Sequence, residues 1–255
     1  MEFMISAKTD IGLTREKNQD SYVVRRYHMP QGDVVFAMIC DGMGGLADGE
    51  IASGTLVRAF CQWADRRLSI LCGNSMLEQE IWREWLQVTD EWNERLQKYG
   101  ERRGRKLGST LTAILLTSQR YYIFHVGDTR VYEIGNEVSL LTKDQTVTVR
   151  EVALGRLTAE QEKEDERKHI LLQCVGASKE VHPEWVCGKT RTGGVYLLCS
   201  DGFWHMATKA ELLELWEAGK KRDSDVLKGS LENIIEQNKE RMERDNMTAI
   251  AIAVF

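Results

Sequence analysis

The apolar run from Val34 to Cys40 ends at Asp41, and a glycine-rich turn begins at Gly42. A short, uninterrupted apolar run bounded by turn residues is typical of a strand buried on both faces. A carboxylate at the end of such a strand is costly unless a partner neutralises it. The sequence therefore predicts a central strand that delivers Asp41 to a site where positive charge is bound.

The same arrangement recurs along the chain. Five strand-like runs have an aspartate at one end, namely Asp20, Asp41, Asp128, Asp201 and Asp245. Any single aspartate is ordinary as a turn or cap residue. Two carboxylates about 4 Å apart, however, repel by roughly 4 kcal/mol at an effective dielectric constant near 20, so a cluster requires protons or cations. An all-oxygen ligand set favours hard ions such as Mg²⁺ or Mn²⁺.

Two further residues fit chemistry on a phosphate group. Gly42 lacks a Cβ atom, so its turn lets a backbone carbonyl approach a metal. Arg15 stands five residues before Asp20, and its planar guanidinium can grip two phosphate oxygens. Two metals about 3.5–4 Å apart can lower the pKa of a bridging water to about 7, which makes hydroxide available at neutral pH.

The remaining pattern predicts an α+β fold. Strand-like runs occupy residues 21–27, 34–40, 111–117, 121–127, 130–134, 195–200 and 247–255. Helical periodicity is clearest at 76–100, and two more helices are expected at about 50–71 and 224–240. Connections such as 118–120 are too short for parallel crossovers. We therefore expect mostly antiparallel sheets covered by helices.

Composition narrows the class of protein. The chain has 255 residues, a net charge of −5 and no apolar run long enough to span a bilayer. These values disfavour a nucleic-acid or membrane surface. The six cysteines form no CxxC motif, which favours free thiols in a cytoplasmic protein. With only two prolines and no repeats, residues 1–255 are expected to form a single domain.

Other motifs in the sequence lack residues that their functions require. Gly42, Gly44 and Ala47 match a dinucleotide-binding turn, but the nearest acidic residue at the required distance, Asp65, lies in a helical pattern. Gly188-Lys189-Thr190 lacks the first glycine of a P-loop, because Pro183 stands there. The five histidines show no metal-binding spacing and are interpreted as core or surface residues.

The motifs taken together resemble a known family. In chain order they are TDIGLTREKNQDS, ICDGMGG, GST, HVGDTR, LTKDQ, CSDGFW and RDNMTAI. This set, which spans nearly the whole chain, resembles the bacterial branch of the metal-dependent protein phosphatases (the PPM or type 2C family). The resemblance implies two packed antiparallel β-sheets flanked by helices, an α-β-β-α sandwich. It also implies two Mn²⁺ or Mg²⁺ ions in the cleft between the sheets, and hydrolysis of phosphoserine and phosphothreonine by a metal-bridged hydroxide.

The resemblance also assigns roles to residues of this chain. By this resemblance, Asp41 bridges both metals. The Gly42 carbonyl binds one of them, and Asp201 and Asp245 bind the other. Asp128 helps to hold a third, weaker metal. Gln19 and Asp20 hold metal-bound waters, and Arg15 binds the phosphate. Thr110 and Asn246 support the site without taking part in catalysis.

The chain departs from the sequence pattern of the family at two positions, and it contains the segment that varies most within the family. Gln19 stands where many relatives have Glu, and Met43 stands where eukaryotic members have a histidine proposed as general acid. Residues 142–178 correspond to the flap of the family, a suspected substrate determinant. Within it, Thr158 and Gln161 have the spacing of a capping box, which predicts a short charged helix.

Two functions from different classes were compared. The favoured one is a monomeric phosphatase acting on Ser/Thr-phosphorylated proteins, the targets of a bacterial Ser/Thr kinase. The alternative is a catalytically silent phosphatase-like adaptor that binds phosphoproteins. Such an adaptor should lack metal ligands, whereas Asp41, Asp201 and Asp245 are all present.

Overall fold

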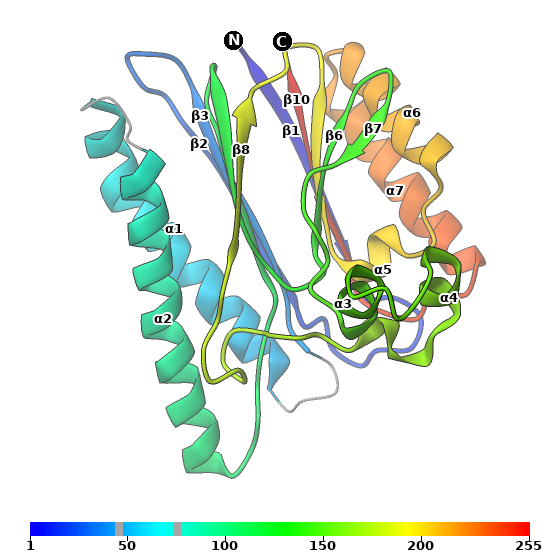
Figure 1. The fold of residues 1–255 in the computed structure, drawn as a ribbon. Helices are drawn as coiled ribbons and strands as arrows, with labels where there is room; N and C mark the ends of the chain where they lie inside the picture. The colour runs from blue at the N-terminus through cyan, green and yellow to red at the C-terminus, as the bar shows by residue number, and fades with distance from the viewer. Residues whose placement is uncertain (44–47, 74–77) are drawn as a thin grey trace.

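The computed structural model describes residues 1–43, 48–73 and 78–255. In these ranges the chain forms two sheets, ordered β1-β10-β9-β6-β7 and β2-β3-β4-β5-β8 (Figure 1). The strands are β1 (Phe3–Asp10), β2 (Asp20–Tyr27), β3 (Val34–Asp41), β4 (Leu111–Leu116), β5 (Arg120–Val126), β6 (Arg130–Ile134), β7 (Val138–Leu140), β8 (Glu184–Lys189), β9 (Val195–Cys199) and β10 (Met247–Val254). Their pairings are antiparallel, as predicted.

Helices cover the outer faces of both sheets. The helices of the described ranges are α1 (Gly49–Gly73), α2 (Glu78–Arg103), α3 (Val147–Ala153), α4 (Ala159–Glu164), the 3₁₀ helix η1 (Glu166–His169), α5 (Asp201–Trp204), α6 (Lys209–Lys220) and α7 (Ser224–Glu240). Figure 1 shows α1 and α2 on the β2–β8 sheet and α6 and α7 on the other. This is the expected α-β-β-α sandwich. No helix in the described ranges is long and apolar enough to cross a membrane.

The core consists of three apolar layers, and the central strands contribute to two of them. In β3, Phe36 and Met38 pack under α1 and α2, whereas Val35 and Ile39 face the other sheet. Successive strand side chains point to opposite faces, so a strand covered on both sides must be apolar at every position. The uninterrupted run before Asp41 is therefore explained by its central position.

The apolar stripe of α2 anchors the outer layer. Trp85 is fully buried, and its ring centroid lies 6.0 Å from those of Phe36 and Phe60 and 5.8 Å from that of Phe124. Burial of such large aromatic rings supplies much of the hydrophobic stabilisation of a layer. The helix predicted at 76–100 is confirmed. Leu77, in the first turn of the predicted helix, lies outside the described residues, as do Gly44 and Ala47 of the alternative dinucleotide-binding turn.

Strand direction explains where the acidic residues gather. Asp20 begins β2 and pairs in register with Asp41 at the end of β3. In the other sheet, Asp201 follows β9 and Asp245 precedes β10. Both termini lie at the opposite end of the sandwich (Figure 1). The strand-end aspartates therefore belong to one end of the two sheets.

Candidate active site

A cleft with a volume of about 630 Å³ lies at this end of the sandwich. Its lining includes five of the residues proposed from the sequence, namely Arg15, Asp41, Asp128, Asp201 and Asp245. Asp41 comes from the sheet under α1 and α2, whereas Asp201 and Asp245 flank strands of the other sheet. The fold thus brings together residues that are as much as 230 positions apart, such as Arg15 and Asp245.

The backbone around Asp41 is tightly fixed. The Asp41 amide donates to Thr110 Oγ1 at 2.9 Å, and the Thr110 amide donates to the Asp41 carbonyl at 2.9 Å. A Cβ atom at position 42 would lie 2.4 Å from the Gly49 carbonyl oxygen and 2.6 Å from that of Gln19. No other residue type fits without a backbone shift, so Gly42 allows the close approach that places Asp41.

Asn246 ties the Arg15 loop to the start of β10. Its Nδ2 atom donates to the carbonyls of Ile11 (2.8 Å) and Lys17 (3.1 Å), and its Oδ1 atom accepts from the Gln19 amide (2.8 Å). These bonds hold both ends of the 11–19 loop against the segment that carries Asp245. The supporting role expected for Asn246 agrees with this geometry.

The aspartates are electrostatically strained in the absence of cations. Burial and repulsion from Asp201 raise the pKa of Asp41 well above its usual range, and the same two causes act on Asp128. Burial, then repulsion from Asp245, raises the pKa of Asp201 to about 6. Burial, opposed in part by hydrogen bonds, raises the pKa of Asp20 to about 7. The cleft therefore favours either protons or positive charge.

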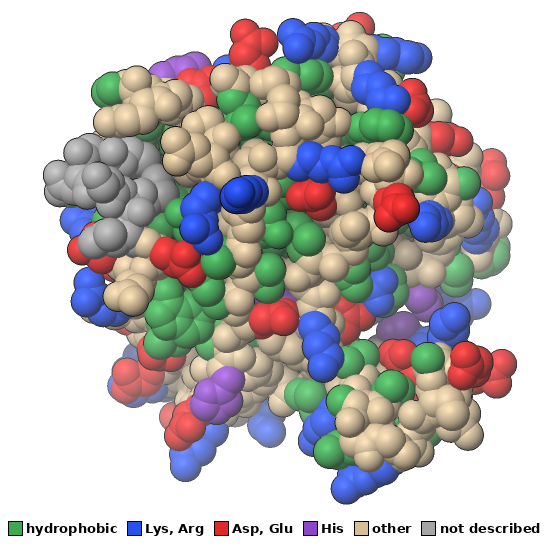
Figure 2. Space-filling model, turned by 45° about the horizontal axis from the view of Figure 1, so that its top comes forward, with side chains coloured by type: hydrophobic (Ala, Val, Ile, Leu, Met, Phe, Trp, Pro, Cys, Tyr) green, Lys and Arg blue, Asp and Glu red, His purple; other side chains and the backbone are tan. Residues whose placement is uncertain are grey.

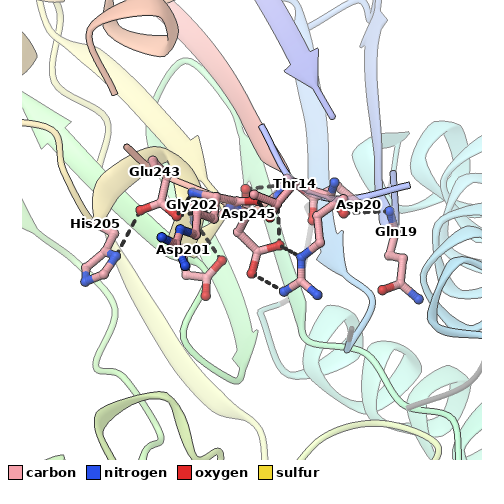
Figure 3. A network of polar contacts seen from close by, with 12 residues as sticks. Thr14, Gln19, Asp20, Asp201, Gly202, His205, Glu243 and Asp245 are labelled. Atoms are coloured by element: carbon pink, nitrogen blue, oxygen red, sulfur yellow. Dashed lines mark hydrogen bonds and ion pairs between the residues drawn. The ribbon is translucent and has the colours of Figure 1, made fainter. Parts of the chain in front are cut away.

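Arg15 supplies part of that charge. Its Nε atom donates to Asp245 Oδ1 at 2.8 Å and its Nη2 atom to Oδ2 at 2.6 Å, a bidentate pair (Figure 3). Both oxygens of Asp245 are therefore engaged by Arg15. Consistent with this, no group of three or more His, Cys, Asp or Glu side chains in the described residues has the spacing of an assembled metal site.

The donor set nevertheless suits a hard divalent cation. The Oδ1 atom of Asp20 is buried without a hydrogen-bond partner in the described structure, and such an atom calls for a water or an ion. The surrounding groups are carboxylates with raised pKa values, which a dication would return to the charged form. These residues fit Mg²⁺ or Mn²⁺ better than a softer metal.

Three predicted residues lie apart from the cleft surface. Gln19 donates through Nε2 to Glu50 at 3.3 Å, and Figure 3 shows its side chain set apart from Asp201 and Asp245. Asp20 accepts from Ser200 Oγ at 2.9 Å. Neither of them, nor Gly42, is among the residues that line the cleft.

Sequence reasoning missed a histidine pair at the rim. His205 and His169 line the cleft, and their rings meet edge to face at 5.1 Å. His205 Nδ1 lies 3.0 Å from Glu243 Oε2, so this nitrogen donates its hydrogen to the carboxylate. The sequence prediction placed these histidines only in the core or at the surface and did not connect them with the cleft. One signal was available, because His205 stands one helical turn after Asp201 and shares its face.

Comparison with known proteins agrees with the fold. A family model described as protein phosphatase 2C matches residues 14–236, and the chain belongs to this family. The serine/threonine phosphatase stp of Listeria innocua is 31% identical over 82% of this chain and 81% of its own.

Solved structures extend the likeness to the whole fold. The serine/threonine phosphatase of S. agalactiae superposes with a TM-score of 0.83 at 26% identity, covering 100% of both chains. The catalytic domain of the phosphatase PstP in complex with two manganese ions superposes with a TM-score of 0.75 at 26% identity, covering 99% of both chains. The sequence-based recognition of the family is confirmed.

Proposed function

We propose that this chain is an active metal-dependent phosphatase that hydrolyses phosphoserine and phosphothreonine in proteins. The observation that carries the proposal is the cleft in which Arg15 and four aspartates from both sheets meet. A silent adaptor would have no need to retain buried carboxylates that repel one another. The relatives named as serine/threonine phosphatases support the same reading.

Metal-binding roles are proposed for the acidic residues. Asp41, the Gly42 carbonyl, Asp201 and Asp245 would hold two Mn²⁺ or Mg²⁺ ions. Asp128 would help to hold a third, weaker ion, and Gln19 and Asp20 would act through water. Bound ions of this kind neutralise a phosphate and lower the pKa of water. The protein supplies their position and a partly buried surrounding that strengthens electrostatic interactions.

Arg15 then acts on the substrate. With Asp245 holding a cation, the guanidinium of Arg15 would be free to bind two phosphate oxygens in the same bidentate manner. Met43 lines the cleft, but its thioether has no proton to give. The leaving oxygen must therefore receive its proton from another group.

The direct test is hydrolysis of p-nitrophenyl phosphate and of a phosphothreonine peptide, with Mn²⁺, with Mg²⁺ and after chelation. We expect activity on both substrates that disappears on chelation and returns with either metal. Activity on neither substrate, in protein shown by calorimetry to bind Mn²⁺, would contradict the proposal.

Replacement of Arg15 by Ala is expected to raise KM roughly 10- to 100-fold and to change kcat little. The lost interactions are charge-assisted hydrogen bonds, each of which contributes about 1.5–3 kcal/mol. Steady-state kinetics with p-nitrophenyl phosphate would measure the split. Arg15→Lys, which keeps the charge but not the planar fork, should give an intermediate KM. A large fall in kcat at constant KM would show that Arg15 acts in the chemical step instead.

Several finer expectations stay proposals. They are that residues 1–255 form one domain with a flap at 142–178, that the protein is a cytoplasmic monomer, and that its substrates are targets of a bacterial Ser/Thr kinase. Size-exclusion chromatography with light scattering would test the monomer, and phosphoproteome comparison of strains with and without this gene would test the substrates.

A further inference from the structure

A second cavity, with a volume of about 430 Å³, opens beside the main cleft. We call it the side pocket; Arg130, Trp204, Lys163 and Lys168 lie in its wall. The two cavities share three lining residues: Asp128, His169 and His205. In Figure 2 a hollow containing histidine side chains separates the body from the lobe at the lower right, where Figure 1 places α4. A substrate bound in the cleft can therefore extend into the side pocket.

One wall of the side pocket is rigid. The Arg130 guanidinium lies 3.3 Å from the centroid of the Trp204 ring and donates to Asp144 at 3.0 Å and 2.6 Å. It also donates to the Tyr132 hydroxyl at 3.0 Å. Trp204 Nε1 in turn donates to the Asp128 carbonyl at 3.0 Å. This wall is fixed relative to the cleft, and the charge of Arg130 is balanced by Asp144.

The other wall belongs to the flap and contributes two lysines to the side pocket. The capping box of Thr158 and Gln161 forms as predicted and starts α4. This helix buries none of its residues, so it adds nothing to the core. Its Lys163 lines the side pocket together with Lys168 from η1, and Lys168 Nζ donates to the Lys163 carbonyl at 3.1 Å. In the described ranges neither lysine forms an ion pair.

Three basic and three acidic side chains line the side pocket; of these, Arg130 and Asp144 form an ion pair, and Asp128 is a proposed metal ligand. The net charge of the protein is −5, which disfavours acidic partners over most of the surface. On the flap wall, two lysines face a single carboxylate, that of Glu162. The indole of Trp204 adds an apolar surface for the stem of a side chain. The wall therefore suits an anionic group carried on a short aliphatic stem.

We propose that the side pocket binds an acidic side chain of the protein substrate, close in sequence to the phosphorylated residue. This inference rests on the proposed function, because it concerns the choice of phosphoprotein. An extended peptide advances about 3.3 Å per residue, so a residue two or three positions from the phosphoresidue spans about 7–10 Å and can reach the neighbouring cavity. Lys163 and Lys168 are then specificity-determining residues.

The test uses phosphothreonine peptides with an alanine background. A single Glu, Gln or Lys is placed two or three positions before or after the phosphoresidue, and kcat/KM is measured with Mn²⁺. Exposed ion pairs give modest energies, so we expect a roughly five- to tenfold preference for Glu over Gln at one of these positions. The preference should weaken as ionic strength rises.

Charge reversal provides the decisive variant. In Lys163→Glu/Lys168→Glu the preference for Glu should vanish or turn into a preference for Lys. The matched control is Lys221→Glu/Lys228→Glu, which makes the same change in net charge at two exposed positions, one directly after α6 and one in α7. The control should keep the wild-type preference. Equal loss in both double variants would assign the effect to the overall field and overturn the proposal.

A binding measurement separates the side pocket from the catalytic function. Non-hydrolysable phosphonate versions of the Glu and Gln peptides are titrated into the wild-type protein with Mg²⁺, and the ratio of Kd values is compared with the ratio of kcat/KM. A five- to tenfold Kd ratio without any turnover would support the side pocket while contradicting the proposed function. Turnover with a ratio near one, or with a preference for apolar or basic residues, would overturn the side pocket alone.

Discussion

Replacement of Asp41 by Asn is expected to lower kcat/KM by about three orders of magnitude or more, which corresponds to about 4 kcal/mol of barrier. Asp41 is the carboxylate proposed to bridge both metals, and an amide cannot supply its negative charge. The same variant should make the metal-free protein more stable, because it removes one of several repelling carboxylates at nearly constant volume. Activity and metal-free stability should therefore change in opposite directions.

The measurements are p-nitrophenyl phosphate kinetics, Mn²⁺ binding by calorimetry, and thermal unfolding with a chelator. Asp225→Asn is a matched control, since Asp225 is exposed in the first turn of α7 and should leave all three quantities unchanged. Wild-type kinetics in Asp41→Asn would remove Asp41 from the site. A lower melting temperature in the metal-free variant would instead show that Asp41 accepts structural hydrogen bonds that outweigh the repulsion.

The metal-free protein is expected to lose stability as the pH rises from about 4 to about 7. In the folded state the pKa of Asp201 is raised to about 6 and that of Asp20 to about 7, whereas unfolded aspartates titrate near 3.9. Over this window the unfolded state releases protons that the folded state retains, so rising pH favours unfolding. At 1.36 kcal/mol per unit, Asp20 alone accounts for a change on the order of 4 kcal/mol.

Bound Mn²⁺ should cancel this loss. Over the same pH window His125 makes the folded state more stable as the pH rises, because burial lowers its pKa to about 4. This effect is present with and without metal, so the quantity to measure is the difference in melting temperature between Mn²⁺-saturated and chelated protein. This difference should grow from near zero at pH 4.5 to roughly 10 °C at pH 7.5, given about 2–4 °C per kcal/mol for a domain of this size. A difference that is independent of pH would show that the aspartates do not bind the metal.

The sequence predicted the inner strands well and the edges of the sheets poorly. β3 and β10 are covered on both faces, so β3 is apolar from Val34 to Cys40 and β10 is apolar from Ala249 to Val254. The strands β1, β7 and β8 were missed, and each lies at the edge of a sheet. Their exposed positions admit polar residues, as in the pattern of β1, and their conformation is set by pairing with a neighbour. The helix α6 was also missed, although Thr208 and Glu211 form a capping box at its start.

The acidic residues of the site could be predicted because each one is marked locally by a strand end. Contacts between side chains that are distant in the sequence have no such local pattern. The pair of His205 and Glu243 is separated by 38 positions, and the stacking of Arg130 on Trp204 joins β6 to α5. For Gln19 the local sequence was a poor guide to side-chain direction. Its position next to Asp20 predicted a place at the metal site, whereas its side-chain amide donates to Glu50. Side-chain direction here depends on the approach of α1.

The division of the aspartates between the two sheets has a mechanical consequence. Apolar contacts such as those of Phe3, Val35 and Ile252 hold the sheets together through the middle of the sandwich. At the cleft end, by contrast, the facing groups are carboxylates that push the sheets apart. Ions held between Asp41 on one sheet and Asp201 and Asp245 on the other would offset this repulsion and hold the cleft ends of the two sheets together. The same ions that serve the reaction would then set the width of the opening through which a phosphorylated side chain enters.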